Sequence, residues 1–143
     1  MIDRSQIGSR SEVREFEVEK GAIRAFANAI GDDNPLYHDE AYARARGFAS
    51  LVAPPTFPAT FRMPKPPVLE SLELRRTLHG EQEFTYTRPI VAGDILRCVN
   101  VLTDIYEREG KQGGKMVFFI LETRGEDLEG NLVFTSKTTI IYR

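Results

Sequence analysis

The sequence predicts one α+β domain in which helices cover one face of an antiparallel sheet. Apolar residues between Lys20 and Ile30 recur at the spacing of an amphipathic helix. After His79, four long runs are rich in Val, Ile, Phe, Tyr and Thr, which is the composition of strands. Because the helical patterns come first and the strands follow, the order of elements is that of an α+β domain.

Length and charge narrow the class of protein. The 143 residues correspond to about one domain, which we expect to span residues 1–143. Nineteen Lys and Arg residues against 21 Asp and Glu residues give a net charge of -2. This balance argues against nucleic-acid binding, because nucleic-acid-binding proteins usually show a basic excess.

Cysteine content and hydropathy indicate the compartment. The single cysteine, Cys98, excludes an internal disulfide framework and fits a reducing environment. No stretch approaches the ~18 consecutive apolar residues of a membrane span, and the N-terminal residues lack the apolar core of a secretory signal. We therefore expect a cytoplasmic protein with no membrane partner. Residues 1–15 are polar, so we expect them to be loosely held.

The first elements are a short strand and a helix. Residues 16–19 are predicted to form the strand. Residues 20–30 form a helix with one apolar stripe, and Gly31 is well placed to end it. The next four residues, 32–35, read Asp-Asp-Asn-Pro, which is a dense turn signal.

Two more helices are predicted before the strands begin. Residues 40–46 form a short helix that stops at Gly47. Residues 55–63 form another, because proline suits the first turn of a helix. The proline-rich residues 64–67 then end it.

The second half is predicted to be a meander of four strands. The strands cover residues 82–88, 95–107, 115–124 and 132–142. The links between them are short and turn-like, with residues 91–94 predicted to form a turn around Gly93-Asp94. Short links join neighbouring antiparallel strands, so each strand is expected to pair with the next.

Four segments together resemble a known family. They read IGDDNPLYH at residues 30–38, APPTF at residues 53–57, and LHGEQEF followed by RPIVAGDIL at residues 78–84 and 88–96. The combination resembles the MaoC-like hydratase/dehydratase family, in its N-terminal MaoC-like or FAS1-like dehydratase branch, over residues 16–143. The resemblance implies a hot-dog fold, a central helix wrapped by a curved antiparallel sheet, and assembly into homodimers or higher homo-oligomers.

The resemblance also implies a reaction. Family members hydrate trans-2-enoyl thioesters reversibly to (R)-3-hydroxyacyl thioesters, carried on CoA or an acyl-carrier protein. The only cofactor-like group is then the CoA or phosphopantetheine of the substrate. Water addition needs a base, an acid and donors for the developing enolate oxygen. No zinc-ligand spacing is present, so we expect no metal.

The family motif Asp-x-Asn-Pro-Leu-His assigns the acid–base residues, and here it fits in more than one register. Anchoring on Asn34-Pro35 makes Asp32 the carboxylate and places Tyr37 at the histidine position. Anchoring on the Asp–His spacing pairs Asp33 with His38. A third option pairs Asp32 with His38, which we favour as the catalytic pair, with Asn34 and Tyr37 shaping the substrate-binding loop.

The second departure from the family concerns the oxyanion donor. The family has His-Gly at the start of its central helix, where this chain has Ala53-Pro54. Proline has no N–H to donate, and losing one such donor costs about 3–4 kcal/mol where it has been measured. The next free amides are those of Thr56 and Phe57. We expect Pro54, Thr56 and Phe57 to contact the substrate.

Structural roles compete with these assignments. Asp32 and Asp33 suit a turn, His38 an exposed helix start, Tyr37 a packed aromatic, and Cys98 an inert buried thiol.

Three function hypotheses remain open. The first is an (R)-specific enoyl-thioester hydratase, or 3-hydroxyacyl-thioester dehydratase. The second is a non-catalytic hot-dog subunit that binds the acyl group and forms a heterodimer with an active MaoC-like chain. The third is an acyl-CoA thioesterase, which rests on fold analogy alone.

Overall fold

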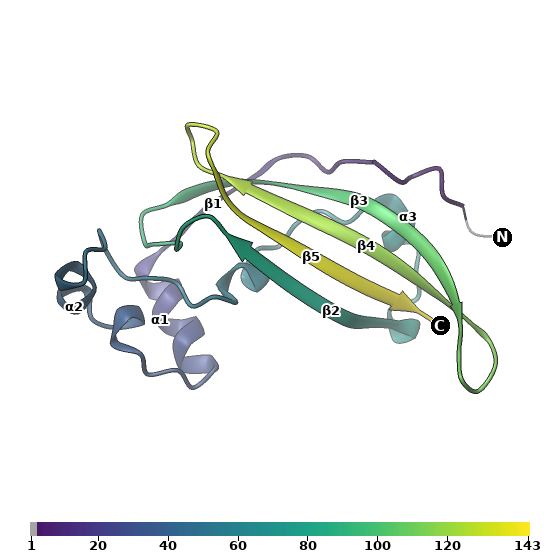
Figure 1. The fold of residues 1–143 in the computed structure, drawn as a ribbon, viewed down its shortest axis with the longest axis horizontal. Coiled ribbons are helices and arrows are strands. Elements are labelled where there is room, and N and C mark those ends of the chain that lie inside the picture. Colours follow the sequence, from purple (N-terminus) through teal and green to yellow (C-terminus); the bar gives the residue numbers. More distant parts are fainter. Residues whose placement is uncertain (1–2) are drawn as a thin grey trace.

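The computed structural model describes residues 3–143 and shows a curved five-stranded antiparallel sheet with short helices gathered mainly at one end (Figure 1). The strands are β1 (Arg14–Glu17), β2 (Thr77–Tyr86), β3 (Ile95–Glu109), β4 (Lys115–Glu126) and β5 (Leu132–Tyr142). The helices are α1 (Lys20–Ala29), α2 (Glu40–Ala45) and α3 (Pro67–Glu70), with 3-10 turns at Pro35–Tyr37, Phe57–Thr60 and Leu74–Arg76. The α+β class is confirmed.

The order of strands is β1-β3-β4-β5-β2, so the predicted meander is only partly correct. β3, β4 and β5 follow one another, but β2 pairs with β5 and not with β3. The link between β2 and β3 turns away instead of forming a hairpin. It binds the segment before the prolines, where the Ala53 amide donates to the Ile90 carbonyl and the Ala92 amide to the Leu51 carbonyl, both at 2.8 Å.

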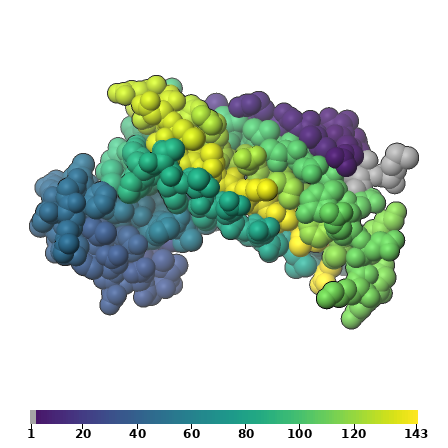
Figure 2. Space-filling model, viewed as in Figure 1, coloured from purple at the N-terminus to yellow at the C-terminus, as the bar shows by residue number. Residues whose placement is uncertain are grey.

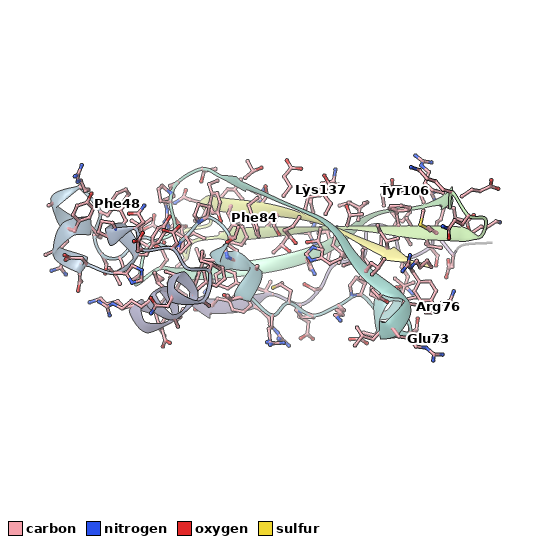
Figure 3. All side chains as sticks on the ribbon, turned by 90° about the horizontal axis from the view of Figure 1, so that it is seen from below. Phe48, Glu73, Arg76, Phe84, Tyr106 and Lys137 are labelled. Atoms are coloured by element: carbon pink, nitrogen blue, oxygen red, sulfur yellow. The ribbon has the colours of Figure 1, made fainter. Side chains whose placement is uncertain are left out.

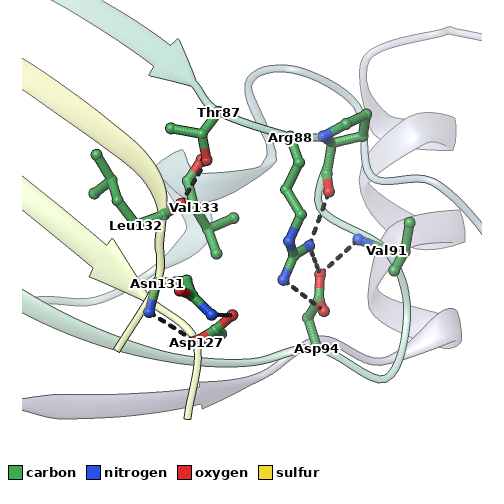
Figure 4. A network of polar contacts seen from close by, with 9 residues as sticks. Thr87, Arg88, Val91, Asp94, Asp127, Asn131, Leu132 and Val133 are labelled. Atoms are coloured by element: carbon green, nitrogen blue, oxygen red, sulfur yellow. Dashed lines mark hydrogen bonds and ion pairs between the residues drawn. The ribbon is translucent and has the colours of Figure 1, made fainter. Parts of the chain in front are cut away.

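A bidentate ion pair holds this link in place (Figure 4). The Arg88 guanidinium donates to both carboxylate oxygens of Asp94, at 2.8 and 3.1 Å. The Val91 amide donates to the same carboxylate at 2.9 Å. Gly93 adopts a φ of 96°, in the left-handed region that favours glycine. The Gly-Asp turn predicted here is therefore present, and it fixes the segment that leads to Pro54.

The helix predicted over residues 55–63 is reduced to one 3-10 turn, Phe57–Thr60. The chain then runs extended to α3. Prolines explain the loss, because each removes an amide donor and its ring clashes with the preceding turn. Pro58 lies within the stretch and Pro64 follows it closely. Residues 57–66 cross the sheet as this single turn followed by extended chain, and this crossing segment is consequently thin. It leaves space beside the sheet.

Residues 8–11, expected to be loosely held, are hydrogen-bonded along β3. The Gly8 amide donates to the Leu102 carbonyl at 2.7 Å and the Ser11 amide to the Asn100 carbonyl at 2.8 Å. Figure 2 shows this purple segment lying against the green strand. Since β1 is short, these bonds satisfy backbone groups of β3 that would otherwise form an open edge. Residues 1–2 of the predicted loose segment lie outside the described residues.

The apolar core has two parts along the sheet. The part under the helical end includes Ile23, Leu51, Leu96 and Phe134. The part at the opposite end consists of Leu69, Leu102, Ile105, Phe119 and Leu121. Figure 3 shows Tyr106 and Lys137 on the outer face of the sheet, away from this core. The space between the thin crossing segment and the inner face joins the two parts.

Candidate functional site

The loop after α1 is built by its own polar side chains. Gly31 ends the helix at a φ of 71°. The Asp32 carboxylate then accepts from the Asn34 amide at 3.0 Å, and the Asn34 side-chain oxygen accepts from the Leu36 amide at 3.1 Å. Such side-chain bonds to the backbone two residues on are typical of Asx turns. Asp32 and Asn34 therefore set the path of the loop.

The structure brings Asp32 and His38 together through the main chain. The Nε2 atom of His38 lies 2.9 Å from the Asp32 carbonyl oxygen. Because a carbonyl only accepts, Nε2 must carry a proton, and in the neutral ring Nδ1 then holds the lone pair. Arg24 donates from Nε to the His38 carbonyl at 3.3 Å and holds the loop against α1. A catalytic role for the pair stays a prediction.

Tyr37, which takes the family's histidine position when the motif is anchored on Asn34-Pro35, is part of the core. Its side chain is buried and packs in the cluster under the helical end. Burial raises the pKa of the Tyr37 phenol, and the negative charge of Asp32 raises it further. The hydroxyl therefore stays protonated at neutral pH and can donate to an anion or to water. Asp33, the alternative carboxylate, is exposed.

The segment expected to supply an oxyanion donor is engaged in its own turn. Pro54 is fully buried, and its carbonyl accepts from the Phe57 amide at 2.9 Å. The Pro55 carbonyl accepts from the Tyr86 hydroxyl, whose pKa is raised to about 12 by burial. Phe57 is buried, with its ring edge-on to Phe26 at 5.7 Å. Thr56 is exposed.

A groove of about 580 Å³ lies between the thin crossing segment and the inner face of the sheet. Its lining comprises Pro58, Ala59, Phe61, Met63, Lys65, Leu69, Glu70, Leu72, Leu74, Thr77, Gln82, Phe84, Asn100, Leu121, Thr123, Phe134, Ser136, Thr138 and Ile140. None of the predicted site residues is in this lining, although Pro58 and Ala59 directly follow Phe57. The sequence signal that could have found it is the proline content of residues 54–67, which prevents a long helix there.

The other chemically notable side chains have structural surroundings. Burial inside β3 raises the pKa of the Cys98 thiol to about 12, so the thiol is neutral at physiological pH. His79 is exposed, with Nε2 3.1 Å from the Gln82 side-chain oxygen. Within residues 3–143, no three His, Cys, Asp or Glu side chains gather closely enough to hold a metal ion. The same residues include no helix long and apolar enough to cross a membrane.

Comparison with known proteins defines the class. The family model for the FAS1-like dehydratase domain region matches residues 5–136, and the chain belongs to this family. A UPF0336 protein of Thermobifida fusca is 38% identical, over 99% of this chain and 94% of the relative.

Solved structures agree with the fold. A MaoC-like dehydratase superposes with a TM-score of 0.82 and 28% identity, covering 96% of this chain and 42% of that one. The HadBC (3R-hydroxyacyl-ACP dehydratase) complex of Mycobacterium tuberculosis gives a TM-score of 0.77 at 24% identity, covering 95% and 96% of the two chains. The hot-dog fold and the MaoC-like family are confirmed.

Proposed function

We propose that this chain is the acyl-binding subunit of a two-chain (R)-specific enoyl-thioester hydratase, or 3-hydroxyacyl-thioester dehydratase in the reverse direction. The groove binds the acyl group, and a second MaoC-like chain supplies the acid–base pair. The observation that carries the proposal is the groove itself, whose lining does not include Asp32 or His38. Its volume, about 580 Å³, lies within the range of about 300–1,000 Å³ common for small-molecule sites.

The loop after α1 supports the proposal that a partner chain supplies the acid–base pair. A hydratase needs a free base near a bound water and a donor for the enolate oxygen. With the motif anchored on Asn34-Pro35, the buried Tyr37 takes the histidine position. Pro54, which matches the family's glycine in the resemblance, cannot donate a hydrogen bond. His38 donates from Nε2 to the Asp32 carbonyl.

A second candidate keeps the chemistry in this chain. The contact of 2.9 Å between His38 and Asp32 leaves Nδ1 available as a base, and the Tyr37 hydroxyl, close enough to feel the Asp32 charge, could help to hold a water. In this hypothesis Asp32 and His38 act as the catalytic pair of a homodimeric hydratase.

The substrate of either form is an acyl thioester of CoA or of an acyl-carrier protein. The reaction uses no cofactor beyond that carrier, because proton transfers and one water suffice. We place it in the cytoplasm, where the free thiol of Cys98 suits a reducing environment.

A crotonyl-CoA hydration assay tests the proposal. The purified chain is assayed alone and together with a second MaoC-like chain from the same genome that carries Asp-x-Asn-Pro-x-His. We expect no turnover by this chain alone and turnover by the pair. In the pair, Asp32→Asn in this chain should leave the rate within about twofold, whereas Asp→Asn in the partner's motif should remove it, since general acid–base catalysis contributes about 10²–10⁴-fold.

The opposite pattern identifies the second candidate. Turnover by this chain alone that is lost in Asp32→Asn, but kept in Asp33→Asn, would assign the chemistry to this chain. Asp33 is the matched control because it is the exposed neighbour with the same charge.

A further inference from the structure

The inner face of the sheet carries a polar band in the middle of the groove. Five side chains from four strands form this band, and all of them line the groove: Gln82, Asn100, Thr123, Ser136 and Thr138. Strand register places them side by side. Asn100 pairs with Thr123, Thr123 with Ser136, and Thr138 with Gln82.

Apolar rows lie on both sides of the polar band. One row consists of paired Cys98, Gly125, Phe134 and Tyr86, toward the helical end. The other contains paired Ile105, Phe119 and Ile140, toward the opposite end. Of these two rows, Phe134 and Ile140 line the groove, so the polar band has an apolar side chain of the sheet on each side of it.

Some hydrogen-bonding groups of the polar band are already paired with one another. The Thr123 hydroxyl donates to the Asn100 side-chain oxygen at 2.7 Å, and the Thr138 hydroxyl to the Gln82 side-chain oxygen at 2.9 Å. His79 also lies on that Gln82 oxygen, at 3.1 Å. Both amide oxygens are thus occupied as acceptors.

Two donors in the polar band remain for a ligand. Ser136 is only 7% exposed, and its hydroxyl, which has no hydrogen-bond partner among residues 3–143, is accessible from the groove rather than fully enclosed. The next residue, Lys137, lies on the outer face (Figure 3), so alternation along β5 directs Ser136 inward. The Gln82 amide nitrogen likewise finds no acceptor in the described part of the chain.

A plain hydrocarbon chain would leave these donors buried and unpaired, which is unfavourable. We propose that the acyl group bound in this groove carries an oxygen acceptor, such as a keto, ether or hydroxyl oxygen, part of the way along its chain. This inference rests on the proposed acyl-binding function. The apolar rows on both sides favour an acyl chain over the pantetheine arm, whose amides lie between the thioester and solvent.

Binding titrations of the full chain test the inference. The probes are decanoyl-CoA, a series of decanoyl-CoA thioesters with one keto group at successive mid-chain carbons, and free CoA. We expect at least one keto probe to bind about tenfold more tightly than decanoyl-CoA, the gain of one net hydrogen bond. Ser136→Ala should remove that preference, so that the keto probe and decanoyl-CoA bind the variant with equal affinity.

Two further variants serve as controls for Ser136→Ala. Thr135→Ala removes a hydroxyl from the same strand on the opposite face and should keep the preference for the keto probe. Gln82→Met offers a second variant should Ser136→Ala unfold.

If decanoyl-CoA binds and no keto probe binds better, the inference fails while the proposed function stands. Weaker binding of free CoA by Ser136→Ala assigns the polar band to the pantetheine arm and overturns the inference. If no thioester binds, the proposed function fails as well.

Discussion

Single side chains in the loop after α1 shape the backbone in addition to any chemistry they do. Asp32 and Asn34 each accept from a main-chain amide two residues on. His38 contacts the main chain of Asp32, and Tyr37 is buried in the core. The motif that signals chemistry in the family is thus used here, at least in part, to hold a bend. Residue identity alone does not separate these roles, because the same carboxylate oxygen can cap a turn or orient a water.

Cys98 gives a pH-dependent prediction at the same scale. Its thiol has an ordinary pKa of 9.0, raised in the fold to about 12 by burial. The buried neutral thiol therefore contributes stability fully below pH 9, and this contribution is lost as pH rises from 9 to about 12. We expect Cys98→Ala to lose stability less steeply than the parent chain over this range, as measured by denaturant unfolding. Parallel stability curves for the two proteins would contradict the burial of an ionisable thiol.

At the scale of elements, prolines limit the length of the turn that crosses the sheet, and a glycine allows a side chain of one strand to pack closely on the next strand. Pro58 and Pro64 limit the crossing segment to one short turn. On β4, Gly125 allows the Phe134 ring of β5 to lie over the strand, because a Cβ at this position would overlap the ring. The thin crossing segment and the close approach of Phe134 together shape one end of the groove.

A matched pair of glycine substitutions tests this packing. Gly125→Ala should lower the free energy of unfolding by about 1–3 kcal/mol, since it forces overpacking against a buried ring. Gly21→Ala, inside α1 with open space around it, should raise the same quantity by about 0.5–1 kcal/mol through helix propensity. Denaturant titration measures both. Equal effects of the two substitutions would show that Phe134 moves away without cost.

At the scale of the whole molecule, the groove occupies the space beside the sheet that a long helix would otherwise fill. Ala59 lies at its wall and is exposed to it. We expect Ala59→Phe to weaken binding of dodecanoyl-CoA by about tenfold or more through steric filling, with less effect on crotonyl-CoA. Ala41→Phe, an exposed position on α2 outside the groove, should leave both affinities unchanged. Loss of both ligands in Ala59→Phe alone would indicate misfolding, which thermal unfolding of the variant checks.

Local patterns predicted most elements but not their pairing. The last strand, residues 132–142, and the first helix agree with the structure to within one residue, because side-chain alternation and an apolar stripe are local properties. The predicted partner of β2 is wrong, because the turn at Gly93-Asp94 lies within a longer link, residues 87–94, that does not form a hairpin. The Arg88–Asp94 pair and the bonds to residues 51–53 direct that link elsewhere. The polar residues 8–11 have no pattern of their own and are ordered by β3.

The amino-acid sequence was enough to predict the α+β class and the bend around Asp32 and Asn34, because these depend on composition, periodicity and local turn residues. The hot-dog fold was predicted from the resemblance to the MaoC-like family. The burial of Tyr37, the position of the groove beside residues 58–74, and the orientation of Ser136 toward the groove are known only from the three-dimensional fold. Those features depend on which strands pair and on which face each residue occupies. Strand pairing joins residues far apart in the chain, which no local pattern specifies.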